Sequence, residues 1–193
     1  LPDLMRYKYK KLRALQGKGT GSGIRGRIGI PFGLNMYENL PFWFELFTRL
    51  NFEVVLSPES SRKLYLKGQR TIPSDTVCYP AKLLHGHVIA LTEAGVDAIW
   101  YPCMSYNNDE GIGDNHYNCP VVAYYPELLA ANVPELKKTR FLDPYVGLWR
   151  RKDFTKRFAK MMEEDFSIPK GETKAAVQAG YAAYEAYEKD VRA

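Results

Sequence analysis

The stretch YPAKLLHGHVIALTEAGVDAIWY, residues 79–101, carries the clearest signal of the fold class. Residues 79–94 predict a helix, because Pro80 is tolerated in a first helical turn and Gly95 is a residue type that commonly follows a helix end. Residues 96–101 form a short apolar run, which predicts a buried strand. A helix that leads directly into a buried strand is the repeating unit of a parallel α/β sheet.

The same alternation extends to both sides of this unit. Further strands are expected at 27–32, 52–56, 120–124 and 140–142, with helices at 39–50 and 60–70. We therefore expect an α/β fold with a Rossmann-like parallel sheet and helices on both faces. Two amphipathic segments after residue 148 add a C-terminal helical extension.

The ends of the chain differ from its middle and suggest three parts. Residues 1–24 are expected to form a basic helix and a Gly-rich linker, 25–148 the Rossmann-like α/β domain, and 149–193 the C-terminal helices. The glycines follow a helix and lead into a strand, which is the reverse of a phosphate-binding loop. Because the first residue is Leu1, we expect the chain to be a fragment of a larger protein.

Composition narrows the class of protein. The chain has 193 residues, a net charge of +5 and three cysteines. An odd number of cysteines without a secretory signal favours a reducing, cytoplasmic location over a disulfide framework. We expect no membrane segment, because no apolar stretch reaches about 18 residues. We also expect no nucleic-acid partner, because no basic stripe with interleaved aromatic residues is present.

The three cysteines are the candidate functional residues, since all lie in predicted loops. Cys103 follows the strand at 96–101, and ligands bind at the carboxyl ends of parallel strands. Cys78 precedes a helix, whose dipole favours a thiolate. Cys119 precedes the strand expected at 120–124 and would ordinarily lie at the opposite edge of the sheet. The long 104–118 loop could fold back and carry it to the same edge. Three thiolates would suit a metal or iron–sulfur centre; the alternative is that each cysteine is a small buried core residue.

Three other residues are candidates for the surroundings of such a centre. His116 lies in a polar loop and could complete a zinc site with the three cysteines. Lys82, four residues after Cys78, could supply positive charge, although an exposed lysine would look the same in the sequence. His85 lies on the same helix face as Cys78, where it either contacts the centre or belongs to the core.

Several motifs in order carry a family resemblance. They are IGIPFGLNMYENLPFWFELFTRLNFEVVLSPESSRKLYLKG, TIPSDTVCYPAKLLHGHV, GVDAIWYPC and DNHYNCPVV, which together span about residues 25–135. The run closely resembles a module of large bacterial activators of 2-hydroxyglutaryl-CoA dehydratase, also called CoA-substrate-specific enzyme activases. That module is similar to the dehydratase and reductase subunits of the same system.

The resemblance implies a function in electron transfer. The related subunits bind an iron–sulfur cluster through loop cysteines and accept low-potential electrons from an ATP-hydrolysing activase. It therefore implies Cys78, Cys103 and Cys119 as ligands of a cluster, with a 4Fe-4S type expected and zinc as the alternative cofactor. The implied partners are ATPase domains and, as a candidate substrate, an acyl-CoA.

Two questions stay open at this point. No ATPase motif is present in the sequence, so ATP hydrolysis is expected in other domains, and whether this chain is itself an enzyme is undecided. The alternative function is a non-catalytic docking or scaffold domain of a multidomain activase, with its cysteines in the core.

Overall fold

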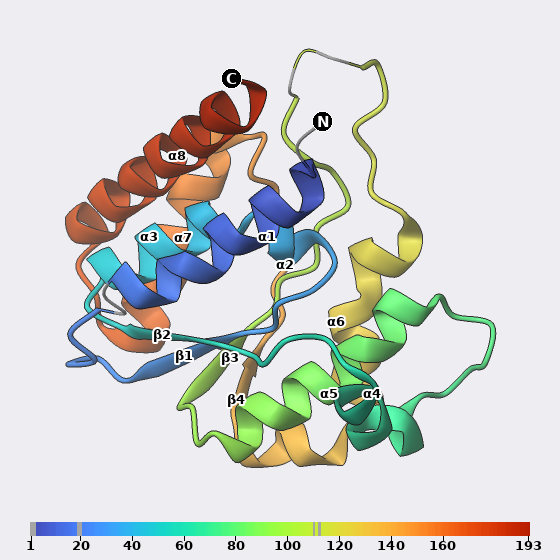
Figure 1. Cartoon of the computed structure of the whole chain (residues 1–193). Helices are drawn as coiled ribbons and strands as arrows, with labels where there is room; N and C mark the ends of the chain where they lie inside the picture. The colour runs from blue at the N-terminus through green and yellow to red at the C-terminus, as the bar shows by residue number, and fades with distance from the viewer. Residues whose placement is uncertain (1–2, 19–20, 110, 112) are drawn as a thin grey trace. The chain divides into compact units, whose positions relative to one another are not determined.

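The computed structural model describes residues 3–18, 21–109, 111 and 113–193, and Figure 1 traces them. Four strands form one parallel sheet in the order β2-β1-β3-β4. Their bounds are β1 Arg27–Ile30, β2 Glu53–Leu56, β3 Ala98–Trp100 and β4 Arg140–Leu142. The predicted α/β class is confirmed. Parts of the predicted basic helix and linker, residues 1–2 and 19–20, lie outside the described residues.

Helices account for most of the rest of the described chain. The α-helices are α1 Leu4–Arg13, α2 Asn35–Glu38, α3 Leu40–Arg49, α4 Arg62–Gly68, α5 Tyr79–Glu93, α6 Pro120–Asn132, α7 Arg151–Phe166 and α8 Lys170–Arg192. Three short 3-10 helices join them: η1 Ala14–Lys18, η2 Gln69–Thr71 and η3 Pro134–Lys138. Among the residues described, no helix has the length and apolarity needed to span a membrane.

The strand predicted at 120–124 is wrong, because these residues begin helix α6. The apolar run PVVAYY favours a strand locally, since β-branched and aromatic residues are enriched there. Three of its four buried residues, however, recur at helical spacing: Ala123, Pro126 and Leu129 are three apart, and Tyr125 is the fourth. Pro120 occupies the first turn, where the missing N–H of proline costs no helical hydrogen bond. Cys119 therefore precedes a helix, as Cys78 does.

The chain divides into two compact units, each of which is discontinuous in sequence. Unit 1 comprises Leu1–Ile28, Tyr37–Val55 and Thr155–Ala193, and unit 2 comprises Gly29–Met36 and Leu56–Phe154. The domain boundaries expected near residues 25 and 148 stay a prediction.

Aromatic packing holds unit 1 together, chiefly between α3 and α8. The Phe42 ring lies 4.8 Å from that of Tyr181 on α8. Close approach of the helices needs a glycine, because a Cβ on Gly180 would lie 3.0 Å from the Phe42 carbonyl oxygen. On the same helix as Phe42, Phe47 packs edge-on against Phe158 of α7 at 6.3 Å. The helices of unit 1 thus enclose a predominantly apolar interior.

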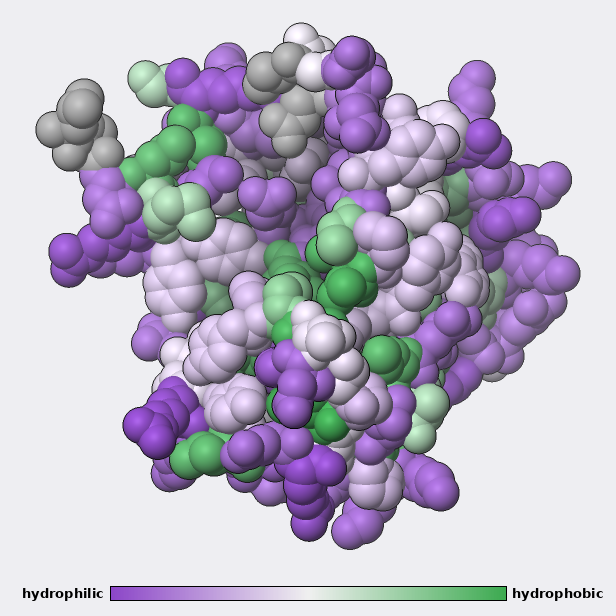
Figure 2. Space-filling view, turned by 90° about the vertical axis from the view of Figure 1, so that its right-hand side faces the viewer, coloured by the Kyte–Doolittle hydropathy of each residue, from purple (hydrophilic) through white to green (hydrophobic). Residues whose placement is uncertain are grey.

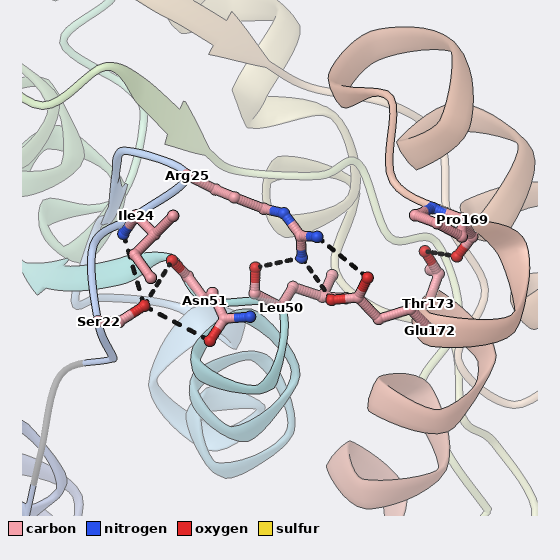
Figure 3. Close-up of polar contacts among 8 residues, drawn as sticks. All are labelled: Ser22, Ile24, Arg25, Leu50, Asn51, Pro169, Glu172 and Thr173. Atoms are coloured by element: carbon pink, nitrogen blue, oxygen red, sulfur yellow. Dashed lines mark hydrogen bonds and ion pairs between the residues drawn. The ribbon is translucent and has the colours of Figure 1, made fainter.

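Polar contacts fasten the ends of unit 1 to α8. Arg25 binds the Glu172 carboxylate through both terminal nitrogens, one of them 3.0 Å from Oε2, and also donates to the Leu50 carbonyl at 2.9 Å (Figure 3). The hydrogen bonding from Arg25 lowers the pKa of the Glu172 carboxyl. At the other end of α8, Asp190 accepts hydrogen bonds from Tyr7, at 2.7 Å, and from Lys11.

Two glycines bring α4 and α5 of unit 2 into close contact. A Cβ on Gly86 would lie 2.0 Å from the Leu64 carbonyl oxygen, and a Cβ on Gly68 would lie 2.3 Å from the Gly86 nitrogen. Real Cβ atoms do not approach that closely, so only glycine fits at either position. Ser61 caps α4 by accepting a hydrogen bond from the Leu64 N–H at 3.1 Å. This packing fixes α5, which begins directly after Cys78.

Candidate thiol site

Cys78 and Cys119 occupy equivalent positions at the starts of two helices. Cys78 is the N-cap residue of α5 and Cys119 the N-cap residue of α6. Both are exposed, and neither side chain caps its helix with a hydrogen bond. Each backbone carbonyl accepts the first helical bond, from the Lys82 N–H at 3.1 Å and from the Ala123 N–H at 2.9 Å. The two thiols are therefore accessible for chemistry.

The helix starts give both thiols an electropositive setting. The first N–H groups of a helix lack partners within it, and the helix dipole adds partial positive charge there. Prolines at Pro80 and Pro120 each remove one such donor. The remaining N–H groups of the first turns can donate hydrogen bonds to a group placed beside the start of either helix.

Cys103 lies in a different environment, beyond the end of β3. It is 1% exposed, and its N–H donates to the Pro144 carbonyl at 3.0 Å, which extends the pairing of β3 with β4. Burial raises the pKa of the Cys103 thiol to about 11, although a backbone hydrogen bond from Glu127 opposes the shift. Cys103 is therefore a neutral thiol near pH 7, and a metal ligand here would first have to lose that proton.

A buried chain of hydrogen bonds lies behind Cys78. His85 Nδ1 is 2.7 Å from Thr71 Oγ1, and His85 Nε2 is 3.0 Å from the Tyr125 hydroxyl. Burial lowers the pKa of His85 to about 4, so the ring is neutral at pH 7. Burial, followed by the charge of an ionised Cys78, raises the pKa of Tyr125 to about 12.

Buried polar atoms of unit 2 that lack a hydrogen-bond partner among the described residues include the Tyr101 hydroxyl, Asn35 Oδ1 and Glu135 Oε2. The Asn35 amide nitrogen is 3.4 Å from the Met104 sulfur. Burial raises the pKa of Tyr101, with smaller contributions from Tyr125 and Cys103. Unpartnered buried polar groups are rare in folded proteins, so this part of unit 2 is a place where a functional constraint is expected.

The side chains of His116 and Lys82 contact residues other than the cysteines. His116 Nε2 is 3.4 Å from Asp109 Oδ1, and its ring centroid is 5.7 Å from that of Tyr106. The Lys82 ammonium donates to the Asp75 carbonyl at 2.7 Å. Within the described ranges, no group of three or more Cys, His, Asp or Glu residues is arranged to hold a metal ion. The roles assigned to the cysteines, His85, His116 and Lys82 stay predictions.

Exposed aromatic residues are frequent in unit 2. Five of them are 41–73% exposed: Tyr79, Tyr117, Tyr124, Tyr145 and Trp149. Tyr79 directly follows Cys78, and Tyr145 pairs with Cys103 as a parallel bridge. Figure 2 shows a face of the molecule on which pale and green side chains gather among purple, hydrophilic ones. Exposed surface of this kind is typical of regions that contact partners.

Comparison with models of known families identifies the family of this chain. The model of the CoA enzyme activase uncharacterised domain (DUF2229) matches residues 27–193. The chain belongs to this family. The resemblance to CoA enzyme activases is thereby confirmed for a longer part of the chain than the motifs covered. Comparison with curated proteins and with solved structures gave no match.

Sequence reasoning found the cysteines of this activase-type domain but missed Thr71, Tyr101 and Tyr125. Nothing in the local pattern distinguishes Tyr125 from the other thirteen tyrosines of the chain. The pairing of His85 with a residue 40 positions away is decided by how α5 and α6 pack. Only the predicted ambiguity of His85, between core and site, pointed toward this cluster.

Proposed function

We propose that this domain binds an iron–sulfur cluster in an ATP-driven activase system and passes low-potential electrons to a 2-hydroxyacyl-CoA dehydratase- or reductase-type reaction. Membership of the CoA enzyme activase family supports the setting. ATP hydrolysis and the acyl-CoA substrate belong in this proposal to partner domains.

One observation carries the proposal: Cys78 and Cys119 are exposed thiols at the starts of α5 and α6. A cluster is held by thiolates, and its potential depends on hydrogen bonds to sulfur. The unpartnered N–H groups of two first helical turns are suitable donors for that purpose. When bound, the cluster would accept and release electrons.

The three cysteines fit such a cluster only in part. A 4Fe-4S cluster normally takes four thiolates, whereas the described residues provide no set of three ligands. We assign Cys78 and Cys119 as the accessible ligands of this chain and infer that further ligands come from outside it. Cys103, which is buried and protonated near pH 7, would join the set only when metal binding displaces its proton.

The test is the iron, sulfide and zinc content of the protein purified without oxygen, together with its visible spectrum. The wild type should contain iron and sulfide and absorb broadly in the visible range. Cys78→Ala and Cys119→Ala should each lose the iron, whereas Ser105→Ala, an exposed neighbour of Cys103, should keep it. The Cys103→Ala variant decides whether Cys103 is a third ligand. Unchanged iron in both Cys78→Ala and Cys119→Ala would overturn the assignment.

A docking or scaffold domain is the second candidate, and the exposed aromatic residues favour it. Tyr79, Tyr124 and Trp149 present apolar surface without belonging to the core, and Tyr and Trp are enriched at protein interfaces. Colourless protein without metal, even after anaerobic reconstitution, would support this function. Stoichiometric zinc without colour would instead indicate a structural zinc site.

A further inference from the structure

A chain of three buried side chains connects three elements of unit 2. Thr71 on η2, His85 on α5 and Tyr125 on α6 are all less than one-tenth exposed. Thr71 is bonded to His85 Nδ1 at 2.7 Å and Tyr125 to His85 Nε2 at 3.0 Å. The His85–Tyr125 bond is a direct polar connection between α5 and α6.

The donors and acceptors in this chain follow from the geometry. Thr71 Oγ1 donates its one proton to the Gly68 carbonyl at 2.8 Å, so it accepts from His85 Nδ1–H. A neutral imidazole that carries its proton on Nδ1 offers a lone pair on Nε2. The Tyr125 hydroxyl therefore donates to His85 Nε2. Each proton in the chain has one acceptor, and the direction of the chain is fixed.

The side of α5 that carries His85 is held in place independently. Gly86, the next residue, lies against the Leu64 carbonyl so closely that a Cβ would come within 2.0 Å of it. The backbones of α5 and α4 are therefore in close contact at this point. His85 is consequently a fixed point, and α6 is attached to that point through Tyr125.

The bonded residues lie at similar distances from the two exposed thiols. His85 follows Cys78 by seven residues and Tyr125 follows Cys119 by six, which correspond to about 10 Å and 9 Å along their helices. The His85–Tyr125 bond is therefore nearly two helical turns from each thiol, measured along the two helices.

We propose that His85 and Tyr125 are positioning residues, whose hydrogen bond attaches α6 to α5 and thereby sets the separation between the thiols of Cys78 and Cys119. This inference rests on the proposed function for its biological meaning, since a cluster requires thiols at a defined spacing. The geometry itself can be measured without any metal.

The experiment attaches nitroxide labels to Cys78 and Cys119 and measures the distance distribution between them by dipolar electron paramagnetic resonance. Buried Cys103 should remain unlabelled, which mass spectrometry checks. Tyr125→Phe keeps the ring and removes the donor; it should widen the distribution about twofold, because the tie between the helices is lost. Tyr124→Phe, an exposed neighbour on α6, is the matched control and should leave the distribution unchanged.

Rescue by a conservative variant separates positioning from simple packing. His85→Gln retains an acceptor for the Tyr125 hydroxyl and should keep a narrow distribution, whereas His85→Leu should widen it as Tyr125→Phe does. Thr71→Val, which removes the acceptor for His85 Nδ1–H, serves if either of these variants fails to fold. Circular dichroism confirms that each variant is folded at the temperature of measurement.

The outcomes distinguish this inference from the proposed function. Unchanged distributions in Tyr125→Phe and His85→Leu would overturn the positioning role, even if the wild type binds iron. If the wild type binds no iron and Tyr125→Phe still widens the distribution, the positioning role stands and the cluster proposal is overturned. Tyr125→Phe should also lower iron retention relative to Tyr124→Phe if both proposals are correct.

Discussion

The two units of the molecule are built on different interiors. Unit 1 is filled by rings, among them Phe42, Trp43 and Phe47 of α3, which are at most 1% exposed. In the described chain, five of the seven buried polar side chains belong to unit 2, and two, Asn39 and Thr173, to unit 1. The five of unit 2 are Asn35, Ser57, Thr71, His85 and His87.

This difference separates stability from specificity. Aromatic packing is weakly directional and stabilises in proportion to the apolar area it buries. A buried polar group contributes only when it is hydrogen-bonded and destabilises strongly when it is not. His87 is a buried polar group whose hydrogen bonds are made, since its ring is bonded to the Ser57 hydroxyl at 2.7 Å and to the Ser60 hydroxyl at 3.0 Å. Unit 2, which holds the three cysteines, is the unit with directional constraints.

The largest expected effect tests the aromatic interior of unit 1. Phe47→Ala removes a fully buried ring that contacts Trp43, Phe52 and Phe158. The free energy of unfolding should fall by about 3–5 kcal/mol, because a cavity is left behind. Denaturant titration measures it, with Leu66→Ala, half-exposed on α4, as the control. A loss no larger than that of the control would contradict the stabilising role of the aromatic interior of unit 1.

The second prediction uses pH to probe the polar interior of unit 2. The pKa of His85 is lowered from 6.5 to about 4 in the folded protein, so the unfolded chain takes up the proton first as pH falls. The stability contribution is complete above pH 6.5 and is lost toward pH 4, by about 3 kcal/mol. Denaturant titrations of wild type and His85→Gln across this range should diverge. If the stabilities of the two proteins change in parallel with pH, the pKa of His85 is not lowered by folding.

The third prediction separates the thiols within unit 2. At pH 8 a maleimide should modify Cys78 and Cys119 at least about 100-fold faster than Cys103, because Cys103 is buried and its pKa is raised. Timed mass spectrometry of peptides measures the three rates, and in denaturant they should become equal. Comparable native rates would show that the Cys103 site opens readily.

The smallest effect concerns the ion pair of unit 1 in Figure 3. The side chains of Arg25 and Glu172 are 28% and 35% exposed, so solvent screens their attraction. A double-mutant cycle of Arg25→Met and Glu172→Gln should give a coupling energy of about 0.5–1 kcal/mol, reduced by added salt. A coupling that salt leaves unchanged would mean that the pair acts as a buried one.

The sequence predicted most elements because their signals are local. Pro80 near the start of α5 and Gly95 after its end bound a helix through their own backbone geometry, and the apolar run that follows formed β3 as expected. The segment after Cys119 was mispredicted for the same reason. Its β-branched residues have a local preference for strands, and the packing of Ala123 and Leu129 overrides it.

The sequence singled out the candidate residues but not their environments. The three cysteines carry recognisable contexts in the sequence, yet the exposure of Cys78 and Cys119 and the burial of Cys103 are not local properties. The side-chain partners of the buried His85 are likewise not its neighbours in the sequence. Thr71 and His85 are 14 residues apart, and His85 and Tyr125 are 40 apart.

The sequence by itself determined the α/β class, the helix boundaries marked by proline and glycine, and the cysteines as the residues to examine. These depend on backbone preferences and on the periodicity of apolar side chains, which act over a few residues. Only the tertiary structure decided that Cys119 begins a helix, that Cys103 is a buried thiol, and that His85 is bonded to Tyr125. Desolvation and hydrogen bonding depend on which segments pack together, and that is decided by the whole chain.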